Sequence, residues 1–290
     1  MLHAENPALR FHIRKCRNWS IGIMEGRSPL VLSPVPGTKN PVLTANDVTD
    51  VTADYLADPF MIRTKSDWYM FFEVMNDRTA RGEIGVANSK DGLNWNYRQI
   101  VLTEPFHLSY PYVFKYREHY YMIPESRAGK AVRIYRATNF PTRWEYVKPL
   151  IKGNFTDPSI FQYANKWWMF VCQFNHTARL FYSEHLMGPW VEHPCSPIIR
   201  NDTAKARCAG RILFLDNRII RFAQNGKPAY GSQVRAFQIV KLTTKSYEER
   251  ELQESPVLTG NGHGWNKNGM HQLDAHQVDA YKWITSVDGW

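Results

Sequence analysis

Three acidic residues combine a suitable side chain with a repeated position, and they could support acid–base chemistry. Asp58 and Asp157 each precede a proline that opens a strand-like segment, and Glu125 follows the apolar segment 122–124. Glycoside hydrolysis uses two carboxyl groups, one to protonate the leaving oxygen and one to activate water or attack the sugar. A lone Asp-Pro commonly forms a turn, but two copies in register favour a function. We therefore treat all three residues as candidate catalytic carboxyls.

Other polar residues occupy equivalent positions or could bind an acidic group of a substrate. Glu73 ends an apolar segment as Glu125 does, although it could instead cap a strand or pair with an arginine. Arginines between 207 and 221, including Arg207, could hold a carboxylate or phosphate bidentately, or could neutralise the acidic residues. The residues from which we expect substrate contacts are Glu73, Tyr110, Arg211, Arg221, Tyr230 and His271.

The sequence favours neither a metal nor a cofactor. His271 and His276 lie near Asp274 and Asp279, but no convincing three-ligand spacing accompanies them. A Gly-rich phosphate loop and a GxSxG elbow are both absent from the sequence. The four cysteines form no CxxC pair, which argues against a zinc site and a disulfide scaffold. We predict no metal, no cofactor and reduced thiols.

Composition and charge narrow the class of protein. Hydrophobic residues make up 43% of the 290 residues and aromatic residues 14%, which is typical of a globular chain. Apolar runs such as 167–172 are far shorter than the ~18 residues of a membrane span. The first residues lack the pattern of a secretory signal, so we expect a cytoplasmic protein without a membrane span.

The net charge of +9 could attract a polyanion. However, the basic residues alternate with strand-like segments, and no recognition helix, RNA-binding motif or zinc finger accompanies them. These observations argue against a nucleic-acid partner. The charge would suit a carbohydrate or sugar-phosphate substrate.

A repeat along the chain indicates how these residues are positioned. Each copy contains short strand-like segments, and the prolines of the first three copies, at 59, 111 and 158, are 52 and 47 residues apart. This spacing is close to the ~40–50 residues of a four-stranded propeller blade. The five copies span 57–95, 110–147, 157–190, 209–247 and, with two segments only, 269–285. The sequence predicts an all-β, five-bladed β-propeller with blades beginning near 57, 109, 156, 208 and 268.

The incomplete fifth copy predicts how the ring closes. It lacks two strands, and the strand-like segments 10–14 and 19–24 near the N-terminus have no other assignment. We expect residues 10–24 to complete the fifth blade, so that 1–290 forms a single domain without free sheet edges. Because the first strand of each blade lines the axis, the residues that open the repeats should converge on one central funnel.

Several segments resemble known families. At Ala57-Asp58-Pro59-Phe60, Tyr110-Pro111-Tyr112-Val113 and Asp157-Pro158-Ser159-Ile160 the sequence resembles the five-bladed propellers of glycoside hydrolase families 43, 32 and 68. Segments 19–23, 40–45, 122–126 and 230–231 more closely resemble the N-terminal propeller domain of plant glucosamine inositolphosphorylceramide transferases and its stand-alone bacterial relatives. This resemblance covers nearly the whole chain.

The resemblance implies roles for some residues and departs from the pattern at others. The family 43 pattern implies a catalytic base at Asp58 and a pKa-tuning aspartate at Asp157. It also implies a glutamic acid in the fourth blade, where this chain has 209–211 (Ala-Gly-Arg) and Gln224. Glu125 is therefore our candidate acid. The transferase relatives carry their glycosyltransferase chemistry in a separate C-terminal domain, so the resemblance does not make this propeller a transferase.

These observations lead to one expected function and its rivals. We expect a carbohydrate-active enzyme, a glycosidase with Asp58 as base or nucleophile, Glu125 as acid and Asp157 tuning the site. A phosphorolytic version would hold phosphate with Arg211, Arg221 and His271. The main alternative is a non-catalytic glycan-binding propeller in polysaccharide or glycolipid assembly. A polyanion-binding scaffold is a third.

Overall fold

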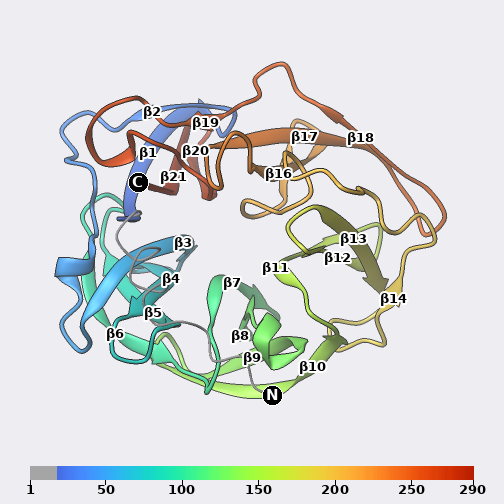
Figure 1. Ribbon diagram of the computed structural model, residues 1–290, viewed down its shortest axis with the longest axis horizontal. Helices are drawn as coiled ribbons and strands as arrows, with labels where there is room; N and C mark the ends of the chain where they lie inside the picture. The colour runs from blue at the N-terminus through green and yellow to red at the C-terminus, as the bar shows by residue number, and fades with distance from the viewer. Residues whose placement is uncertain (1–17) are drawn as a thin grey trace, which may run out of the picture.

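The computed structural model describes residues 18–290, which form strands, turns and loops without an α-helix in that range. Five antiparallel sheets surround a central axis (Figure 1). The expected five-bladed β-propeller is confirmed. Three short 3₁₀ turns interrupt the loops: Ala45–Asp47, Arg127–Gly129 and Gly264–Asn266.

The first three blades each contain four strands that follow one another outward from the axis. Blade 1 contains β3 (Ala53–Arg63), β4 (Trp68–Asn76), β5 (Arg81–Ser89) and β6 (Asn96–Leu102). Blade 2 contains β7 (Ser109–Tyr116), β8 (His119–Glu125), β9 (Ala131–Asn139) and β10 (Arg143–Lys152). Blade 3 contains β11 (Thr156–Tyr163), β12 (Lys166–Gln173), β13 (Thr177–Ser183) and β14 (Val191–Glu192).

The last two blades are less regular. Blade 4 contains β15 (Leu213–Leu215), β16 (Arg218–Asn225), β17 (Gln233–Leu242) and β18 (Tyr247–Glu251), and β19 (Leu258–Thr259) also pairs with β17. Blade 5 contains β20 (Leu273–Asp279), β21 (Lys282–Gly289), β1 (Ser20–Ser28) and β2 (Val31–Pro34). The innermost strands thus begin at residues 53, 109, 156, 213 and 273, compared with the expected 57, 109, 156, 208 and 268.

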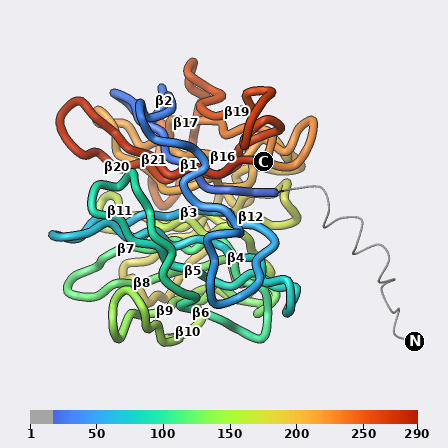
Figure 2. Tube along the Cα trace, turned by 90° about the vertical axis from the view of Figure 1, so that its left-hand side faces the viewer, coloured from blue at the N-terminus to red at the C-terminus, as the bar shows by residue number. Residues whose placement is uncertain are grey.

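The N-terminal strands complete the fifth blade, as expected. β1 runs antiparallel to β21 from the pair Ser20 and Gly289 to the pair Gly26 and Trp283, and Figure 2 shows the two strands side by side. The strands involved differ from the prediction, because the outer strand is β2 and not 10–14. Segment 10–14 lies outside the described residues. Main-chain hydrogen bonds between the two ends of the described chain therefore join the sheet that closes the ring.

A β-bulge opens three of the blades in the same way. Asp58, Tyr110 and Asp157 have φ angles of 54°, 47° and 49°, and at each the pairing of the innermost strand with the next shifts in register. A left-handed conformation costs a non-glycine residue about 1–3 kcal/mol, and the bulge redirects its side chain. In blade 4 the left-handed residue is Gly210, where a Cβ would lie 1.8 Å from the Leu273 carbonyl oxygen. Only glycine fits there.

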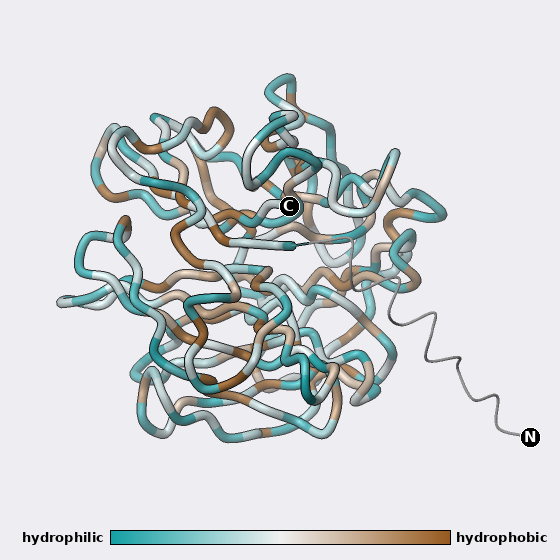
Figure 3. Tube along the Cα trace, turned by 60° about the vertical axis from the view of Figure 1, so that its left-hand side comes forward, coloured by the Kyte–Doolittle hydropathy of each residue, from teal (hydrophilic) through white to brown (hydrophobic). Residues whose placement is uncertain are grey.

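Apolar side chains pack between neighbouring blades. The ring of Phe60 on β3 lies 5.1 Å from that of Tyr112 on β7, and the ring of Phe71 on β4 lies 5.4 Å from that of Trp144 on β10. Figure 3 shows hydrophobic segments along the strands and hydrophilic ones on the peripheral loops. Within residues 18–290, no helix has the length and apolar composition that a membrane span requires.

Candidate active site

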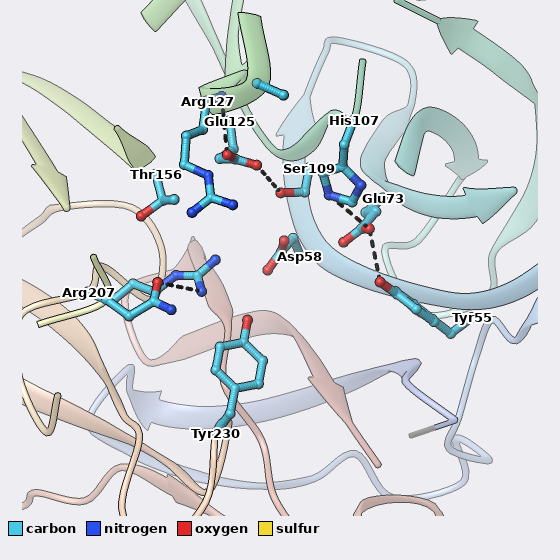
Figure 4. A pocket seen from close by; sticks show the side chains of 12 residues that line it. Tyr55, Asp58, Glu73, His107, Ser109, Glu125, Arg127, Thr156, Arg207 and Tyr230 are labelled. Atoms are coloured by element: carbon cyan, nitrogen blue, oxygen red, sulfur yellow. Dashed lines mark hydrogen bonds and ion pairs between the residues drawn. The ribbon is translucent and has the colours of Figure 1, made fainter. Parts of the chain in front are cut away.

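A polar cavity of about 340 Å³ lies at one end of the axis (Figure 4). The start of each innermost strand and the end of the second strand meet at this end, because neighbouring strands are antiparallel. Its volume is within the ~300–1,000 Å³ of typical small-molecule sites. The cavity is lined by Tyr55, Asp58, Glu73, His107, Ser109, Glu125, Arg127, Ala128, Thr156, Asn175, Arg207 and Tyr230.

Asp58 presents a buried carboxyl group to this cavity from the bulge of β3. Its Oδ2 accepts a hydrogen bond from the Tyr110 N–H at 3.2 Å, whereas Oδ1 has no hydrogen bond and lies 3.5 Å from Nε2 of His271. Burial raises the pKa of Asp58 well above its usual range; His271 opposes this shift, and the nearby carboxylates add to it. The buried carboxyl group therefore holds its proton to a higher pH than an exposed aspartate does.

His271 lies behind Asp58 and does not line the cavity. Its Nδ1 is 2.8 Å from Oδ1 of Asp288, which leaves Nε2 directed at Asp58. Burial lowers the pKa of His271, but the two aspartates outweigh burial and raise it overall. His271 is therefore placed to stabilise ionised Asp58. It is not among the residues that line the cavity, whereas we had expected it to contact the substrate.

The side chains of Asp58, His271 and Asp288 also approach closely enough to be considered as metal ligands. One ligand atom from each lies within 4.8 Å of the others. However, Asp288 already accepts hydrogen bonds from the backbone N–H groups of Asp58, His271 and Gln272. Nδ1 of His271 also faces Oδ1 of Asp288, so the three residues form a hydrogen-bonded triad.

Glu73 lies on β4, where it pairs with Ala57 of β3, and its carboxyl group lines the cavity. Its Oε1 accepts a hydrogen bond from the Tyr55 hydroxyl at 3.1 Å and lies 3.4 Å from Nε2 of His107. The Gly82 N–H donates to Nδ1 of His107, so the proton of the neutral ring is on Nε2 and faces Glu73. Burial raises the pKa of Glu73 to about 8; the Tyr55 hydrogen bond opposes the shift and the charge of Glu125 adds to it.

Glu125 ends β8 on the neighbouring blade. The Ser109 hydroxyl donates to Oε2 at 3.1 Å, and the Arg127 N–H donates to Oε1 at 3.2 Å. Burial raises the pKa of Glu125, while His107 lowers it. Asp58, Glu73 and Glu125 thus form a group of three buried carboxyls with raised pKa values, which is the composition that proton transfer to and from a bound substrate requires.

Two guanidinium groups provide positive charge in the same cavity. Arg207 forms a two-pronged ion pair with Asp157 and lies over the ring of Tyr230, 5.3 Å from its centroid. The guanidinium of Arg127 points into the cavity toward Thr156 and Arg207 (Figure 4). Among residues 18–290 no carboxylate forms an ion pair with Arg127. The cavity could therefore hold an anionic group between the two arginines.

Asp157 lies behind Arg207 and does not line the cavity. It is fully buried, and Gln224 Nε2 also donates to its Oδ2 at 3.1 Å. Its negative charge raises the pKa values of Asp58 and Glu125. Asp157 also positions Arg207 through their ion pair.

The structure corrects the expected positions of three further residues. Tyr110 is fully buried, and its hydroxyl accepts the Gly210 N–H at 2.7 Å. Arg211 pairs with Asp274 and donates to the carbonyls of Met61 and Val113 along the axis. Arg221 is fully buried in a two-pronged pair with Glu249. All three lie outside the lining of the cavity and bond instead to protein partners in their own or neighbouring blades.

Other cavity residues were not identified from the sequence. Ser109 and Thr156 immediately precede the bulged residues of blades 2 and 3, so aligning the repeats could have found them. Tyr55 lies on β3 before the first bulge. His107 and Asn175 lie in loops, and Arg127 lies in a 3₁₀ turn. No repeat pattern marks a loop residue, because loops differ between blades.

Known proteins resemble this chain in sequence and in fold. The family described as glucosamine inositolphosphorylceramide transferase 1, N-terminal, matches residues 15–290. Glucosamine inositolphosphorylceramide transferase 1 of Oryza sativa subsp. japonica is 36% identical over 296 residues, which cover 94% of this chain and 40% of the rice protein. The chain thus spans about two fifths of the length of this curated relative.

Solved structures share the propeller fold at low sequence identity. One of them comes from the GH130 family of mannoside phosphorylases, which contains glycoside hydrolases that target β-1,2 mannosidic linkages in Candida mannan. It has a TM-score of 0.61 at 12% identity, and the match covers 91% of this chain and 93% of that chain. A family 117 glycoside hydrolase of Zobellia galactanivorans has a TM-score of 0.53 at 12% identity, covering 80% and 84%. The sequence matches settle the relationship: the chain belongs to the family of the N-terminal domain of glucosamine inositolphosphorylceramide transferase 1.

Proposed function

We propose that the chain is a carbohydrate-active enzyme that acts on a glycosidic bond in the axial cavity. One observation carries the proposal: Asp58, Glu73 and Glu125 converge there from two blades, and all three have raised pKa values. A non-catalytic binding site would not need buried carboxyls poised to exchange protons, because neutral hydrogen-bonding groups suffice to hold sugar hydroxyls. The propeller folds of glycoside hydrolases in families 117 and 130 are in keeping with this function.

The carboxyls take different roles in this proposal. Asp58 acts as base toward a water molecule or as nucleophile at the sugar carbon, and His271 stabilises its ionised form. Glu73, protonated below about pH 8, is the first candidate for the acid that protonates the leaving oxygen. Glu125 is the second candidate acid, since both of its oxygens are engaged by Ser109 and the Arg127 N–H. Asp157 tunes the site through its charge and through Arg207.

The two arginines extend the proposal to the substrate class. Arg127 and Arg207 face the same cavity, and guanidinium groups bind phosphate bidentately. We therefore propose a sugar that carries a phosphate group, or phosphate itself as the attacking group in phosphorolysis. The name of the rice relative combines an amino sugar, glucosamine, with an inositolphosphoryl group, which is a cyclic polyol with a phosphate ester. Arg127 and Arg207 would then bind the phosphate that we had expected Arg211, Arg221 and His271 to hold.

The experiment is a sugar-release assay with and without inorganic phosphate. The panel contains nitrophenyl glycosides, glucosamine and its β-1,4-linked dimer and trimer, and mannose and its β-1,2-linked dimer and trimer. Wild type is compared with Asp58→Asn, Glu73→Gln and Glu125→Gln, and with Glu145→Gln on the exposed outer strand β10 as the matched control. We expect a loss of about 10²–10⁴-fold for Asp58→Asn and for the variant of the true acid, and none for Glu145→Gln.

Each other outcome selects a different function. Turnover that requires phosphate would establish phosphorolysis in place of hydrolysis. Retained sugar binding without turnover in every protein would instead favour a glycan-binding propeller.

The described cysteines, Cys172, Cys195 and Cys208, are free thiols, which supports a reducing compartment such as the cytoplasm. That location, and a single domain over 1–290, stay predictions.

A further inference from the structure

The axial cavity adjoins a second, smaller hollow of about 160 Å³. Asn175, Arg207 and Tyr230 line both, so the two spaces are compartments of one site separated by a shared wall. Arg207 is held in this wall by Asp157, and the Tyr230 ring packs against the rings of Trp19 and His271, at 6.5 and 5.3 Å between centroids. The second compartment is lined by Asn175, Thr203, Arg207, Gln224, Gly226 and Tyr230.

Gln224, which lines the second compartment, carries a buried hydrogen-bond acceptor without a partner. Gln224 is only 2% exposed, and its amide nitrogen donates to Asp157 and to the Cys208 carbonyl. Its Oε1 has no hydrogen-bond partner among the described residues. Buried acceptors are almost always satisfied in native proteins, so this oxygen is available for a hydroxyl donor from a ligand.

The hairpin that carries Asn175 also holds an unusual aromatic residue. Phe174 and Asn175 have φ angles of 57° and 61°, and two other hairpins show the same left-handed pair, at Ala164-Asn165 and Asp216-Asn217. Asparagine and aspartate suit such positions, whereas a bulky side chain does not. The first position of the other two pairs is alanine or aspartate, so phenylalanine departs from the local preference.

Packing does not explain this phenylalanine. Its side chain is 67% exposed, and its ring stacks on that of the nearby His176 at 5.9 Å. An exposed aromatic ring in an unfavourable backbone conformation, next in the chain to a residue that lines both compartments, indicates a function. The face of a sugar ring presents C–H groups that pack on the negative face of an aromatic ring.

We propose that the second compartment and Phe174 form a further sugar subsite, which takes the ring that follows the one held in the axial cavity. The proposal rests on the proposed function and adds that the substrate is at least a disaccharide or an equivalent glycoside. Gln224 Oε1 accepts a hydroxyl hydrogen from the second ring, and Asn175 and Thr203 offer further polar contacts. Phe174, next to Asn175 in the same turn, provides the stacking surface.

The binding test uses the monomer, dimer and trimer of glucosamine and of mannose described above, titrated by calorimetry into the full chain. We expect the dimer of the recognised sugar to bind more tightly than its monomer. Phe174→Ala should weaken dimer binding roughly 3- to 10-fold, as expected for one aromatic contact, and leave monomer binding unchanged. Phe214→Ala is the matched control, because Phe214 is 54% exposed on β15 and its ring lies beside that of Tyr163, at the end of β11 away from the cavity.

A stability measurement separates this role from a structural one. Phe174→Asn places at this position a residue that suits its left-handed backbone, so we expect an unchanged or higher Tm together with weaker dimer binding. A clear fall in Tm for this variant would show that Phe174 serves the fold, and would overturn its role as a sugar platform.

The binding results distinguish the two proposals. Binding of none of the six sugars to the wild type would overturn the proposed function and the subsite together. Equal affinity for monomer and dimer, or no effect of Phe174→Ala, would overturn the subsite alone.

Discussion

Asp58 in blade 1 and Asp157 in blade 3 share a local structure but have opposite surroundings. Both adopt a left-handed conformation before a proline, at the bulge that opens the innermost strand. Asp157 is paired with Arg207 and accepts a hydrogen bond from Gln224. Asp58 accepts one backbone hydrogen bond on Oδ2, and its Oδ1 lies 3.5 Å from a histidine nitrogen.

This difference shows what separates a reactive carboxyl from a structural one in this fold. The bulge brings a carboxyl group to the axial end of the blade in both cases. The partner then decides its role, because a two-pronged guanidinium pair holds the Asp157 side chain in place, whereas burial without such a partner raises the pKa of Asp58. The two partners come from other parts of the chain: Arg207 pairs with Asp157, and His271 lies beside Asp58.

Asp58→Asn tests the reactive half of the comparison and should have the largest effect. Turnover should fall by about 10³-fold, because the base or nucleophile is lost. The Tm should stay the same or rise above neutral pH, since the folded state no longer holds a carboxyl whose ionisation it opposes. Parallel kinetics and thermal denaturation at pH 8 check both. A large fall in Tm would make Asp58 a structural residue like Asp157.

Asp157→Asn tests the structural half. The change leaves the Arg207 guanidinium without its charged partner, and we expect a loss of roughly 3–5 kcal/mol in the free energy of unfolding. The control is Asp216→Asn, which breaks an exposed ion pair with Arg218 and should cost less than about 1 kcal/mol. Equal effects in urea unfolding would contradict the structural role of the buried pair.

The pH dependence of the free energy of unfolding should reflect the raised pKa of Glu73, which lies in the same blade as Asp58. The pKa of Glu73 is raised from 4.5 to about 8, so the folded state retains a proton that the unfolded chain releases. The free energy of unfolding should therefore fall as pH rises from about 4.5 to 8, by up to a tenfold change in the folding equilibrium per pH unit.

Glu73→Gln should reduce this dependence without abolishing it, because Asp58 and Glu125 also have raised pKa values. If Glu73 is the acid, wild-type turnover should also fall about tenfold per pH unit above pH 8. Urea unfolding and turnover across pH 5–9 are the measurements. A wild-type stability that rises through this range would contradict the raised pKa.

The third bulge residue, Tyr110, should show the smallest effect. Tyr110→Phe removes the hydroxyl that accepts the Gly210 N–H, and we expect a loss of about 1–2 kcal/mol in stability with unchanged turnover. Tyr281→Phe, at a 79% exposed position, should change neither. A fall in turnover for Tyr110→Phe without a fall in stability would restore the substrate contact expected from the sequence.

The repeat allowed the fold to be predicted, but only part of the site. Strand order and ring closure follow from hydrophobic alternation and turn spacing, which are local properties of the chain. Glu73 and Glu125 reach the cavity because they occupy equivalent positions on the second strands, each paired with the residue that precedes the bulge of its blade. Arg211 and Arg221 could not be separated from Arg207 on the same grounds, because their roles depend on the partners that other strands and blades bring to them.

By itself, the sequence determined the five blades, the N-terminal closure of the ring and the carboxyls that open or end the inner strands. These follow from patterns repeated along the chain. Only the tertiary structure decided that Arg207, and not Arg211 or Arg221, enters the cavity, that His271 lies behind Asp58, and that a second compartment adjoins the first. Burial, charge pairing and pKa depend on contacts between residues up to about 230 positions apart, such as Asp58 and Asp288, and no local pattern records them.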